Sequence, residues 1–365
     1  MAEPQRVEPE RVEREEEEVS PQIDPAPEPE AVIEPDDDFT DNDSTYEGSI
    51  GDASYTTSIT SSAMKYLYER PRIRLPTWLC TETQQNGRRY HAYHEGEYVL
   101  PNDEQEQDRL DLSNHIYRML FKGELHRAPV KSPRRVLDMG TGTGIWAIDF
   151  ADDNPESEVI GNDLSPIQPS WIPPNCRFEV DDYEEPWSYS QPFDYIHGRE
   201  LEGFIRDHNR LFRQAYENLI PGGWLEMSSM EVNSYSDDGT HLKATHMMEA
   251  VKGMHEASRI LGKDMSTTPS WKDRMEKAGF VNVREDIYKL PQSPWAKDPK
   301  LKDLGRYHQV NMFEASGSYT YALFTRHLGW SREECEVLAA GMRRELKDLS
   351  LHLYTKVHIV YGQRP

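Results

Sequence analysis

The fold of this chain is decided by the stretch RRVLDMGTGTG, residues 134–144. Val136 and Leu137 are typical of a buried strand, and the largely apolar run 145–151 predicts a helix directly after the last glycine. Because glycine has no Cβ, the backbone of such a turn can take unusual dihedral angles, and a ligand can lie close against it. The start of the helix adds N–H groups without partners in the helix. The stretch therefore predicts a strand, a nucleotide-binding turn and a helix.

The spacing of the glycines and the carboxylate before them indicate which nucleotide ligand is bound. Gly140, Gly142 and Gly144 follow the pattern G-x-G-x-G, whereas a dinucleotide-binding turn has G-x-G-x-x-G. Asp138 stands two residues before the first glycine, where its charge would repel a pyrophosphate but suits a ligand with an ammonium group. S-adenosylmethionine carries such a group and is the predicted cofactor. A lone Gly-x-Gly is usually only a turn, so the prediction depends on the residues that follow.

A second carboxylate, Asp163, ends the strand predicted at 158–163 and lies 19 positions beyond Gly144. An acidic side chain at the tip of the second strand can accept hydrogen bonds from both ribose hydroxyls. Taken alone, Asp163 could also be a helix N-cap. Because strand, turn, helix and second strand occur in this order, we assign Asp163 to the ribose.

Two further carboxylates, Asp181 and Asp182, follow the strand predicted at 177–180. A carboxylate here can accept a hydrogen bond from the adenine amino group, and Tyr183 or Trp187 can pack on the ring. We favour Asp182 as the acceptor, while a turn explains Asp181 as well as a ligand role does. The predicted cofactor-binding residues are Asp138, Gly140, Thr141, Gly142, Gly144, Asp163, Leu164, Asp181 and Asp182.

The first part of the chain is strongly acidic. Residues 1–50 hold 18 Asp and Glu against 3 Arg, together with seven prolines and few large apolar residues. Fixing the backbone costs roughly 1–2 kcal/mol per residue, which such a composition cannot offset by burial. Residues 1–55 are therefore expected to form a disordered acidic tail. The tail could bind a partner or could only keep the protein in solution.

Composition excludes several function classes. The first residues lack an apolar signal core and no run of 18 apolar residues occurs, so we expect an intracellular protein without a membrane span. Three cysteines far apart in sequence give no zinc spacing, and no metal site is expected. The net charge of −24 argues against direct binding of nucleic acid, which requires clustered Lys and Arg.

The rest of the chain divides into a cap and a main domain. Residues 56–130 are expected to form an N-terminal cap or substrate-lid region, whose helix at 104–121 is placed to cap the cofactor cleft. The helix predicted at 207–219 should end at the turn 221–223. Residues 131–365 form the main domain, with further strands at 193–197, 224–227, 280–288 and 352–361, further helices at 246–261 and 271–278, and a helical insertion at about 295–349 that can form a lid.

Several phrases of the sequence resemble a known family. VLDMGTGTG (136–144), DLSP (163–166) and PGGWLE (221–226) resemble the class I S-adenosylmethionine-dependent methyltransferases. The longer phrases GRRYH (87–91), LPNDE (100–104), GIWA (144–147), SPIQP (165–169) and FDYIH (193–197) resemble the fungal LaeA-like methyltransferases. The resemblance covers about residues 54–361. The stretch 198–200 departs from it, because a more apolar or amide-bearing stretch is expected there.

This resemblance implies an α/β, Rossmann-like fold with a seven-stranded sheet of order 3-2-1-4-5-7-6, strand 7 antiparallel, and helices on both faces. It also implies binding of S-adenosylmethionine by the glycine turn, Asp163 and Asp182. Several members of the family regulate secondary metabolism and development in the nucleus, some with velvet-domain proteins, and others methylate small natural products. We therefore expect a protein of the cytoplasm, the nucleus or both, with a protein or a small molecule as methyl acceptor.

The chemistry requires alignment more than acid–base catalysis. Methyl transfer is an in-line displacement at the carbon bound to the sulfonium, so the protein must hold donor and acceptor in line and exclude water. An oxygen or amine acceptor must also lose a proton, and His197 at the tip of the strand at 193–197 is the candidate base. A histidine satisfied by backbone contacts explains His197 equally well. His308 and His246 are weaker candidates.

Three functions fit these observations. The first is an active methyltransferase that regulates secondary metabolism, which the complete cofactor set favours. The second is a methyltransferase that modifies a small natural product. The third is a regulatory binding protein that uses the fold without catalysis, which the acidic tail favours. No Asn/Asp-Pro-Pro-Tyr follows residue 197, which weakens the case for an amide or adenine nitrogen as acceptor.

Overall fold

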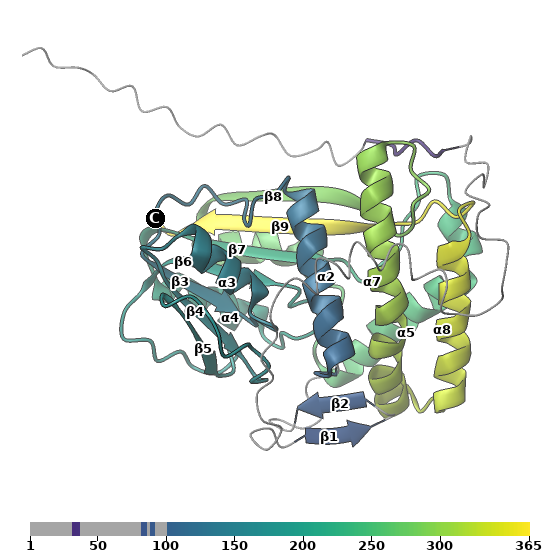
Figure 1. The fold of residues 1–365 in the computed structure, drawn as a ribbon, viewed down its shortest axis with the longest axis horizontal. Coiled ribbons are helices and arrows are strands. Elements are labelled where there is room, and N and C mark those ends of the chain that lie inside the picture. Colours follow the sequence, from purple (N-terminus) through teal and green to yellow (C-terminus); the bar gives the residue numbers. More distant parts are fainter. Residues whose placement is uncertain (1–30, 37–81, 86–87, 92–100) are drawn as a thin grey trace, which may run out of the picture.

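The computed structural model of the 365-residue chain describes residues 31–36, 82–85, 88–91 and 101–365. These residues form a central sheet with helices on both sides and a further group of helices beyond one end of the sheet (Figure 1). Most of the tail predicted at 1–55, and residues 56–81 of the predicted cap region, lie outside the described residues.

The sheet has seven strands in the predicted order. They are β3 (Arg135–Met139), β4 (Glu158–Asp163), β5 (Cys176–Val180), β6 (Phe193–Arg199), β7 (Leu219–Met230), β8 (Val281–Pro291) and β9 (Tyr354–Gln363). Their spatial order is β5-β4-β3-β6-β7-β9-β8, and β9 alone runs antiparallel to its neighbours. Counted from β3 as strand 1, this order is 3-2-1-4-5-7-6. The predicted fold class is confirmed.

Helices cover both faces of the sheet. The α-helices of the described residues are α2 (Glu104–Leu120), α3 (Ile145–Asp153), α4 (His208–Asn218), α5 (Thr245–Leu261), α6 (Trp271–Lys277), α7 (Pro299–Leu323) and α8 (Arg332–Lys347), of which α2, α3, α4 and α6 pack on the sheet. Val136 of β3 packs in one core with α2 and α3, and the next residue, Leu137, packs in another with α4 and α6. Because successive side chains of a strand point to opposite faces, a strand buried on both sides needs a continuous apolar run.

A third core lies between α5, α7 and α8, which stand together beyond one end of the sheet (Figure 1). The arrow of β9 points away from these helices, so the parallel strands, which run opposite to β9, end beside them. Helix α2 packs along α7 on the same side. The residues of the insertion expected at about 295–349 form α7, a π-helical turn at Phe324–Leu328 and α8. Ligands bind at this end of open α/β sheets.

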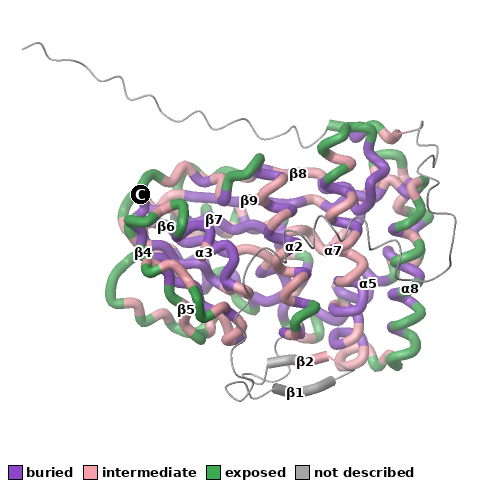
Figure 2. The backbone as a smooth tube through the Cα atoms, in the orientation of Figure 1, coloured by how far each residue is buried: buried purple, intermediate pink, exposed green. Residues whose placement is uncertain are grey.

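Burial follows this layering. Figure 2 shows the central strands buried, while much of α8 is exposed on its outer side. Among the helices that the structure describes, none combines the length and the apolar character needed to cross a membrane.

Strand β7 differs from the sequence prediction. The sequence predicts a turn at 221–223 before the strand at 224–227. In the structure β7 already begins at Leu219 and runs through the expected turn. Gly222 takes the left-handed conformation, with φ of 84°, and its N–H donates to the carbonyl of Arg364. Arg364 in turn donates to the carbonyl of Gly223. The end of the chain therefore pairs with these residues as part of the sheet, a long-range contact that the local Pro-Gly-Gly signal does not contain.

The N-terminal part of the chain is described in two places. Strands β1 (Glu82–Gln85) and β2 (Arg88–His91) form an antiparallel pair. Residues 31–36 lie against the main domain, where Ile33 is buried and Pro35 forms an antiparallel bridge with Ala296. At these six residues the prediction of a disordered tail is corrected, since Ile33 supplies the apolar anchor that the surrounding acidic sequence lacks.

Helix α5 is capped by a side chain from another helix. The residue before it, Ala244, has no side chain that could accept a hydrogen bond. Instead the carboxylate of Glu345, on α8, accepts from the backbone N–H groups of His246 (2.9 Å) and Met247 (2.8 Å). It also pairs with Nδ1 of His246, so this histidine, a weak candidate base, is used in the structure of the helical group.

We expect Glu345→Ala to lower the free energy of unfolding by about 1–2 kcal/mol, because two N–H groups at the start of α5 lose their acceptor. Urea unfolding followed by circular dichroism measures the change. Glu249→Ala is the matched control, since Glu249 is an exposed carboxylate on α5 itself. Equal losses in the two variants would contradict this role of Glu345.

Candidate cofactor site

The side chain of Asp138 stabilises the glycine turn. One carboxylate oxygen of Asp138 accepts from the Thr141 hydroxyl at 2.6 Å, and the other pairs with Nδ1 of His197 at 2.7 Å. Asp138 is only 3% exposed, and it lies beside His197 because β3 and β6 pair in register at these residues. Asp138 and Thr141 therefore fix the shape of the turn. The expectation that Asp138 faces the ammonium group of a ligand is not supported by this geometry.

His197 does not reach the cleft as a base would. Its ring is 2% exposed and stacks on Trp146 of α3, with 3.8 Å between the ring centroids and 6° between their planes. A base must come within hydrogen-bond reach of the acceptor proton. The buried ring instead supports Asp138 from the side, so we interpret His197 as a positioning residue in place of the predicted catalytic one. Its partner is a carboxylate, not the backbone contact considered as the alternative.

A second set of bonds joins the turn to β4. The backbone N–H of Gly142 donates to Asp163 at 2.8 Å, and the N–H of Gly140 donates to the side chain of Asn162 at 3.2 Å. The N–H of Ser165 donates to the other oxygen of Asp163 at 2.9 Å. Each carboxylate oxygen has two lone pairs, so Asp163 keeps capacity to accept from a ligand. Asn162 is a structural residue of the site that the sequence did not indicate.

The three glycines of the turn have different roles. All three have positive φ, of 61°, 57° and 79° in chain order, a region that glycine enters without strain. A Cβ on Gly140 would meet Leu201 at 2.6 Å, and one on Gly144 would meet Phe178 at 2.4 Å. A Cβ on Gly142 would meet only Leu110, at 3.5 Å. Gly140 and Gly144 therefore make room for the protein's own side chains, while a Cβ at Gly142 would make only an ordinary van der Waals contact.

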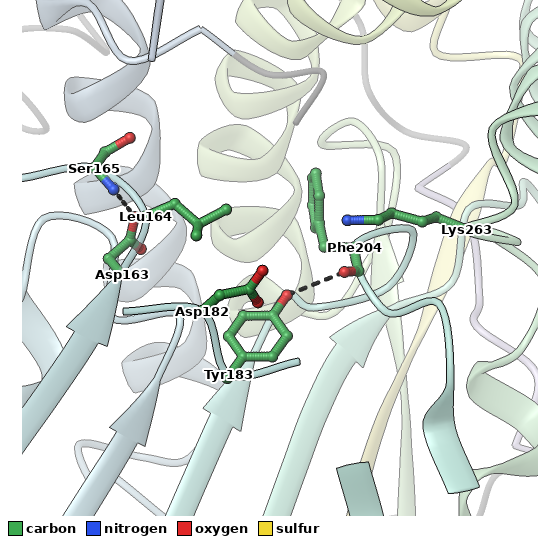
Figure 3. Close-up of a pocket in the computed structure, with 7 residues that line it drawn as sticks. All are labelled: Asp163, Leu164, Ser165, Asp182, Tyr183, Phe204 and Lys263. Carbon is green, nitrogen blue, oxygen red and sulfur yellow. Dashed lines mark hydrogen bonds between the residues drawn. The ribbon is translucent and has the colours of Figure 1, made fainter. Parts of the chain in front are cut away.

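A pocket opens beside this turn (Figure 3). It is lined by Asp163, Leu164, Ser165, Asp182, Tyr183, Phe204 and Lys263. Asp163 is the last residue of β4, the next two residues follow that strand, and Asp182 and Tyr183 follow β5, so the pocket lies at the carboxyl ends of adjacent parallel strands. The structure thus brings together three predicted cofactor residues, Asp163, Leu164 and Asp182.

Asp181 and Asp182 have different environments, in agreement with the preference for Asp182 as the acceptor. Asp181 is exposed, and its carboxylate accepts from the N–H of Asp182, which is a turn contact. Asp182 lines the pocket, and so does the neighbouring Tyr183 ring. Trp187 does not line it and donates its indole N–H to the carbonyl of Tyr183. Of the two aromatic residues predicted to pack on a bound ring, Tyr183 is therefore the one that lines the pocket.

Phe204 and Lys263 are pocket residues that sequence analysis missed. Phe204 follows β6, and its carbonyl accepts from the Tyr183 hydroxyl at 3.3 Å (Figure 3). Lys263 follows α5 and lies across the pocket from Asp163. Its ammonium group pairs with Glu184 at 3.5 Å. Neither residue belongs to a motif, and only the folding of the chain brings α5 to this place.

Burial raises the pKa of Asp163 to about 6. The N–H groups of Ser165 and Gly142 act against this rise, because they stabilise the charged carboxylate, and the nearby charge of Asp138 adds to it. Asp163 is therefore ionised at neutral pH and becomes protonated in mildly acidic solution.

The stretch 198–200 joins β6 to α2. Arg199 donates to the side-chain oxygen of Asn114 at 2.9 Å. The carboxylate of Glu200 accepts from the hydroxyl of Tyr117 and from the N–H of Met230. Glu200 has a φ of 58°, which is strained for a residue with a Cβ, and burial raises its pKa. The residues that depart from the family pattern thus form a buried polar link beside the carboxyl end of β6.

Two buried donors near this link lack a partner among the described residues. They are Nδ2 of Asn114 on α2 and Nε2 of His308 on α7. Burial lowers the pKa of His308 to about 3, so its ring is neutral. Nδ1 of that ring lies 3.5 Å from the amide nitrogen of Asn311, which leaves the proton on Nε2. Unpaired buried donors are costly, so both can be satisfied by a bound molecule.

No three His, Cys, Asp or Glu side chains of the described residues are grouped so that they could hold a metal ion.

Comparison with known proteins identifies relatives. A family model described as a methyltransferase domain matches residues 113–285. The chain is 41% identical to methyltransferase pytC of Aspergillus terreus over 312 residues, 85% of this chain and 91% of that protein. It is 35% identical to the secondary metabolism regulator LAE1 of Cochliobolus heterostrophus, over 77% of this chain and 94% of that protein. A solved structure of Haemonchus contortus phosphoethanolamine N-methyltransferase 2 with S-adenosylmethionine has a TM-score of 0.42 at 16% identity, covering 86% of this chain and 75% of that chain.

We expect the affinity for S-adenosylmethionine to fall by about tenfold per pH unit below about pH 6, where Asp163 takes up a proton that must leave again on binding. Above that pH the carboxylate is already ionised, so the affinity should be constant. Isothermal titration calorimetry between about pH 5 and pH 8 measures this. In Asp163→Asn the slope should vanish, and an unchanged slope in that variant would assign the proton to another group.

Proposed function

The chain belongs to the S-adenosylmethionine-dependent methyltransferases, in the LaeA-like group, and on this premise we propose which residues hold the cofactor and where the acceptor enters. In this proposal S-adenosylmethionine lies across the carboxyl ends of β3, β4 and β5. Asp163 accepts from the ribose hydroxyls, Asp182 accepts from the adenine amino group, and Tyr183 packs on the ring. The observation that supports it most is that Asp163 and Asp182, predicted separately, line one pocket, and that Asp163 also accepts from the N–H of Gly142.

The hydrogen-bonding groups of the pocket are of the type that S-adenosylmethionine requires. Ribose hydroxyls and an amino group are donors, and the pocket offers two carboxylates as acceptors from neighbouring strands. Of the three glycines of the turn, Gly142 is the least crowded by the protein's own side chains, and its N–H is bonded to Asp163. The nucleoside end of the cofactor is thereby fixed by residues whose own positions are fixed by the sheet.

Alignment is the main contribution of the protein. The cofactor supplies a methyl group on a positively charged sulfur; when an acceptor attacks that carbon, the carbon–sulfur bond breaks and the sulfur keeps the electron pair. Holding the reactants in this geometry can supply roughly 7–11 kcal/mol of the barrier. The anchored turn, Asp138 with Thr141 and His197, prevents the cofactor cradle from shifting during the step.

The acceptor side is proposed to be the space between β6, α2 and α7. Glu200 there is half-buried, and its backbone has a strained conformation of a kind that is common at functional sites. Tyr117 binds its carboxylate, and Asn114 and His308 on the facing helices hold donors that have no partner among the described residues. An acceptor with a carbonyl or hydroxyl oxygen can satisfy such donors. Glu200 with its raised pKa could take the proton from a hydroxyl or amine acceptor.

A regulatory role is the second part of the proposal. The relative LAE1 is named a secondary metabolism regulator, and the acidic tail of this chain offers charge for partner recognition. We therefore place the protein in the control of secondary metabolism, acting in the nucleus or the cytoplasm, with velvet-domain proteins as candidate partners. The relative pytC is named only a methyltransferase, so a small-molecule acceptor is the alternative.

Asp163→Ala should abolish measurable binding of S-adenosylmethionine, since the ribose loses its acceptor. Asp181→Ala is the matched control, because Asp181 is a neighbouring exposed carboxylate that does not line the pocket, and its affinity should change less than about threefold. Calorimetry on both folded variants decides the point. Tight binding by Asp163→Ala would refute the assignment of the cofactor pocket.

Glu200→Gln should reduce methyl transfer by about tenfold or more while the affinity for S-adenosylmethionine stays unchanged, because only the acceptor side is altered. The readout is transfer of a radioactive methyl group from the cofactor into the protein and small-molecule fractions of an extract of the source organism. Glu185→Gln, an exposed carboxylate, is the control. Label in proteins supports the regulatory role, and label in metabolites supports the alternative. Binding of the cofactor without any transfer by the wild type would support the non-catalytic function.

A further inference from the structure

A groove far along the chain from the cofactor motifs holds a short segment of the acidic tail. The segment is 31–36, AVIEPD, and it lies beside the N-terminal end of α7, where Figure 1 draws it in purple. We call this place the tail groove. Its walls are Tyr235, Lys289, Trp295, Ala296, Lys302 and Tyr354.

One aliphatic side chain anchors the segment. Ile33 is 8% exposed and packs with Trp295, Ala296 and Tyr354 in a small core that is separate from those of the sheet. Its neighbour Val32 is 75% exposed. The groove therefore selects one apolar position of an extended chain and leaves the adjacent one in solvent, as strand geometry requires.

The backbone of the segment is paired along one edge with residues 295–297. The N–H of Asp36 donates to the carbonyl of Trp295 at 2.9 Å, and the N–H of Lys297 donates to the carbonyl of Glu34 at 2.9 Å. These two bonds form the antiparallel bridge between Pro35 and Ala296. Proline has no N–H to lose in this arrangement. Binding of an extended peptide by main-chain pairing and one side-chain pocket is a known recognition mode.

Charge makes the groove selective for acidic sequences. Lys302 pairs with Asp36, and Lys297 pairs with Glu34. Lys289 donates to the carbonyl of Ala31 at 2.8 Å and to Asp237 at 2.7 Å, and that carboxylate accepts from the N–H of Ile33 at 3.1 Å. Two of these three lysines thus pair with acidic side chains of the segment, while Lys289 is shared between the backbone of the segment and Asp237 of the domain.

The walls of the groove are held by contacts that do not involve the segment. The indole N–H of Trp295 donates to the carbonyl of Leu353 at 2.8 Å. Tyr354 donates its hydroxyl to Asp237 at 2.9 Å and pairs through its backbone with Tyr235. Since these bonds remain when the segment leaves, the groove should keep its shape and be able to bind a peptide again.

We propose that the tail groove is a peptide-binding site for extended acidic segments with one aliphatic anchor, and that residues 31–36 are its resident, exchangeable ligand. A protein partner that carries the pattern aliphatic–acidic–proline–acidic would compete with the resident segment for the same groove. Its binding would release the tail from the domain. The inference is independent of methyl transfer.

The test uses the full chain with the groove vacated by Ile33→Asp and Asp36→Lys, two changes within the segment and none in the domain. A fluorescent peptide of residues 29–38, PEAVIEPDDD, is titrated and its anisotropy measured. It should bind the vacated chain saturably and the wild type at least about tenfold more weakly, because the tethered segment acts at a high effective concentration. The same peptide with Asp at the Ile33 position should not bind.

Charge specificity is tested on the vacated chain with Lys302→Glu, which should remove peptide binding. Lys300→Glu, an exposed lysine two positions earlier on α7, is the matched control and should leave it unchanged. Hydrogen exchange gives an independent readout. In the single variant Asp36→Lys, the backbone amides at positions 36 and 297 should lose the protection that their hydrogen bonds give them in the wild type. No binding to the vacated chain, or equal binding to vacated and wild-type chains, would overturn the proposal.

Discussion

The carboxylate of Asp138 is the constraint on which the site depends. Its two oxygens hold Thr141 of the turn and His197 of the neighbouring strand, and the His197 ring lies flat on Trp146 of the following helix. Strand, turn, helix and adjacent strand are thus locked together by one buried, almost fully enclosed side chain. A buried charge is stable only when it is paired and hydrogen-bonded, and here the pairing is what gives the turn a single shape.

Much of the fold could be predicted because its signals are local. Strand β4 was predicted with its observed bounds, since an apolar run stops at a carboxylate, and Asp163 could be placed at its tip for the same reason. The sheet order came from the family resemblance, not from any local pattern. What could not be predicted are the consequences of long-range pairing. Nothing near Pro221 shows that Arg364 will continue the sheet there.

The same distinction explains the errors within the site. Asp138 reads as a ligand because carboxylates at strand tips often are, and its burial becomes visible only when β6 places His197 opposite it. Lys263 comes to the pocket from the end of α5, about a hundred residues after Asp163, so no spacing rule could include it. Residues that line the ligand pocket and residues that support them can be of the same type in the sequence. Only the packing of the folded chain shows which role each residue has.

The position of β9 bears on how the protein is synthesised. Within the sheet β8 pairs only with β9, and β9 follows it in the chain after the whole helical insertion. During translation β7 and β8 are made before β9. Each therefore keeps an open edge until β9 has left the ribosome and inserts between them. Open edges attract other strands, so the nascent chain is exposed to wrong pairing for as long as the insertion takes to be made. The length of the helical insertion, α7 to α8, thus also determines the delay before β9 can complete the sheet.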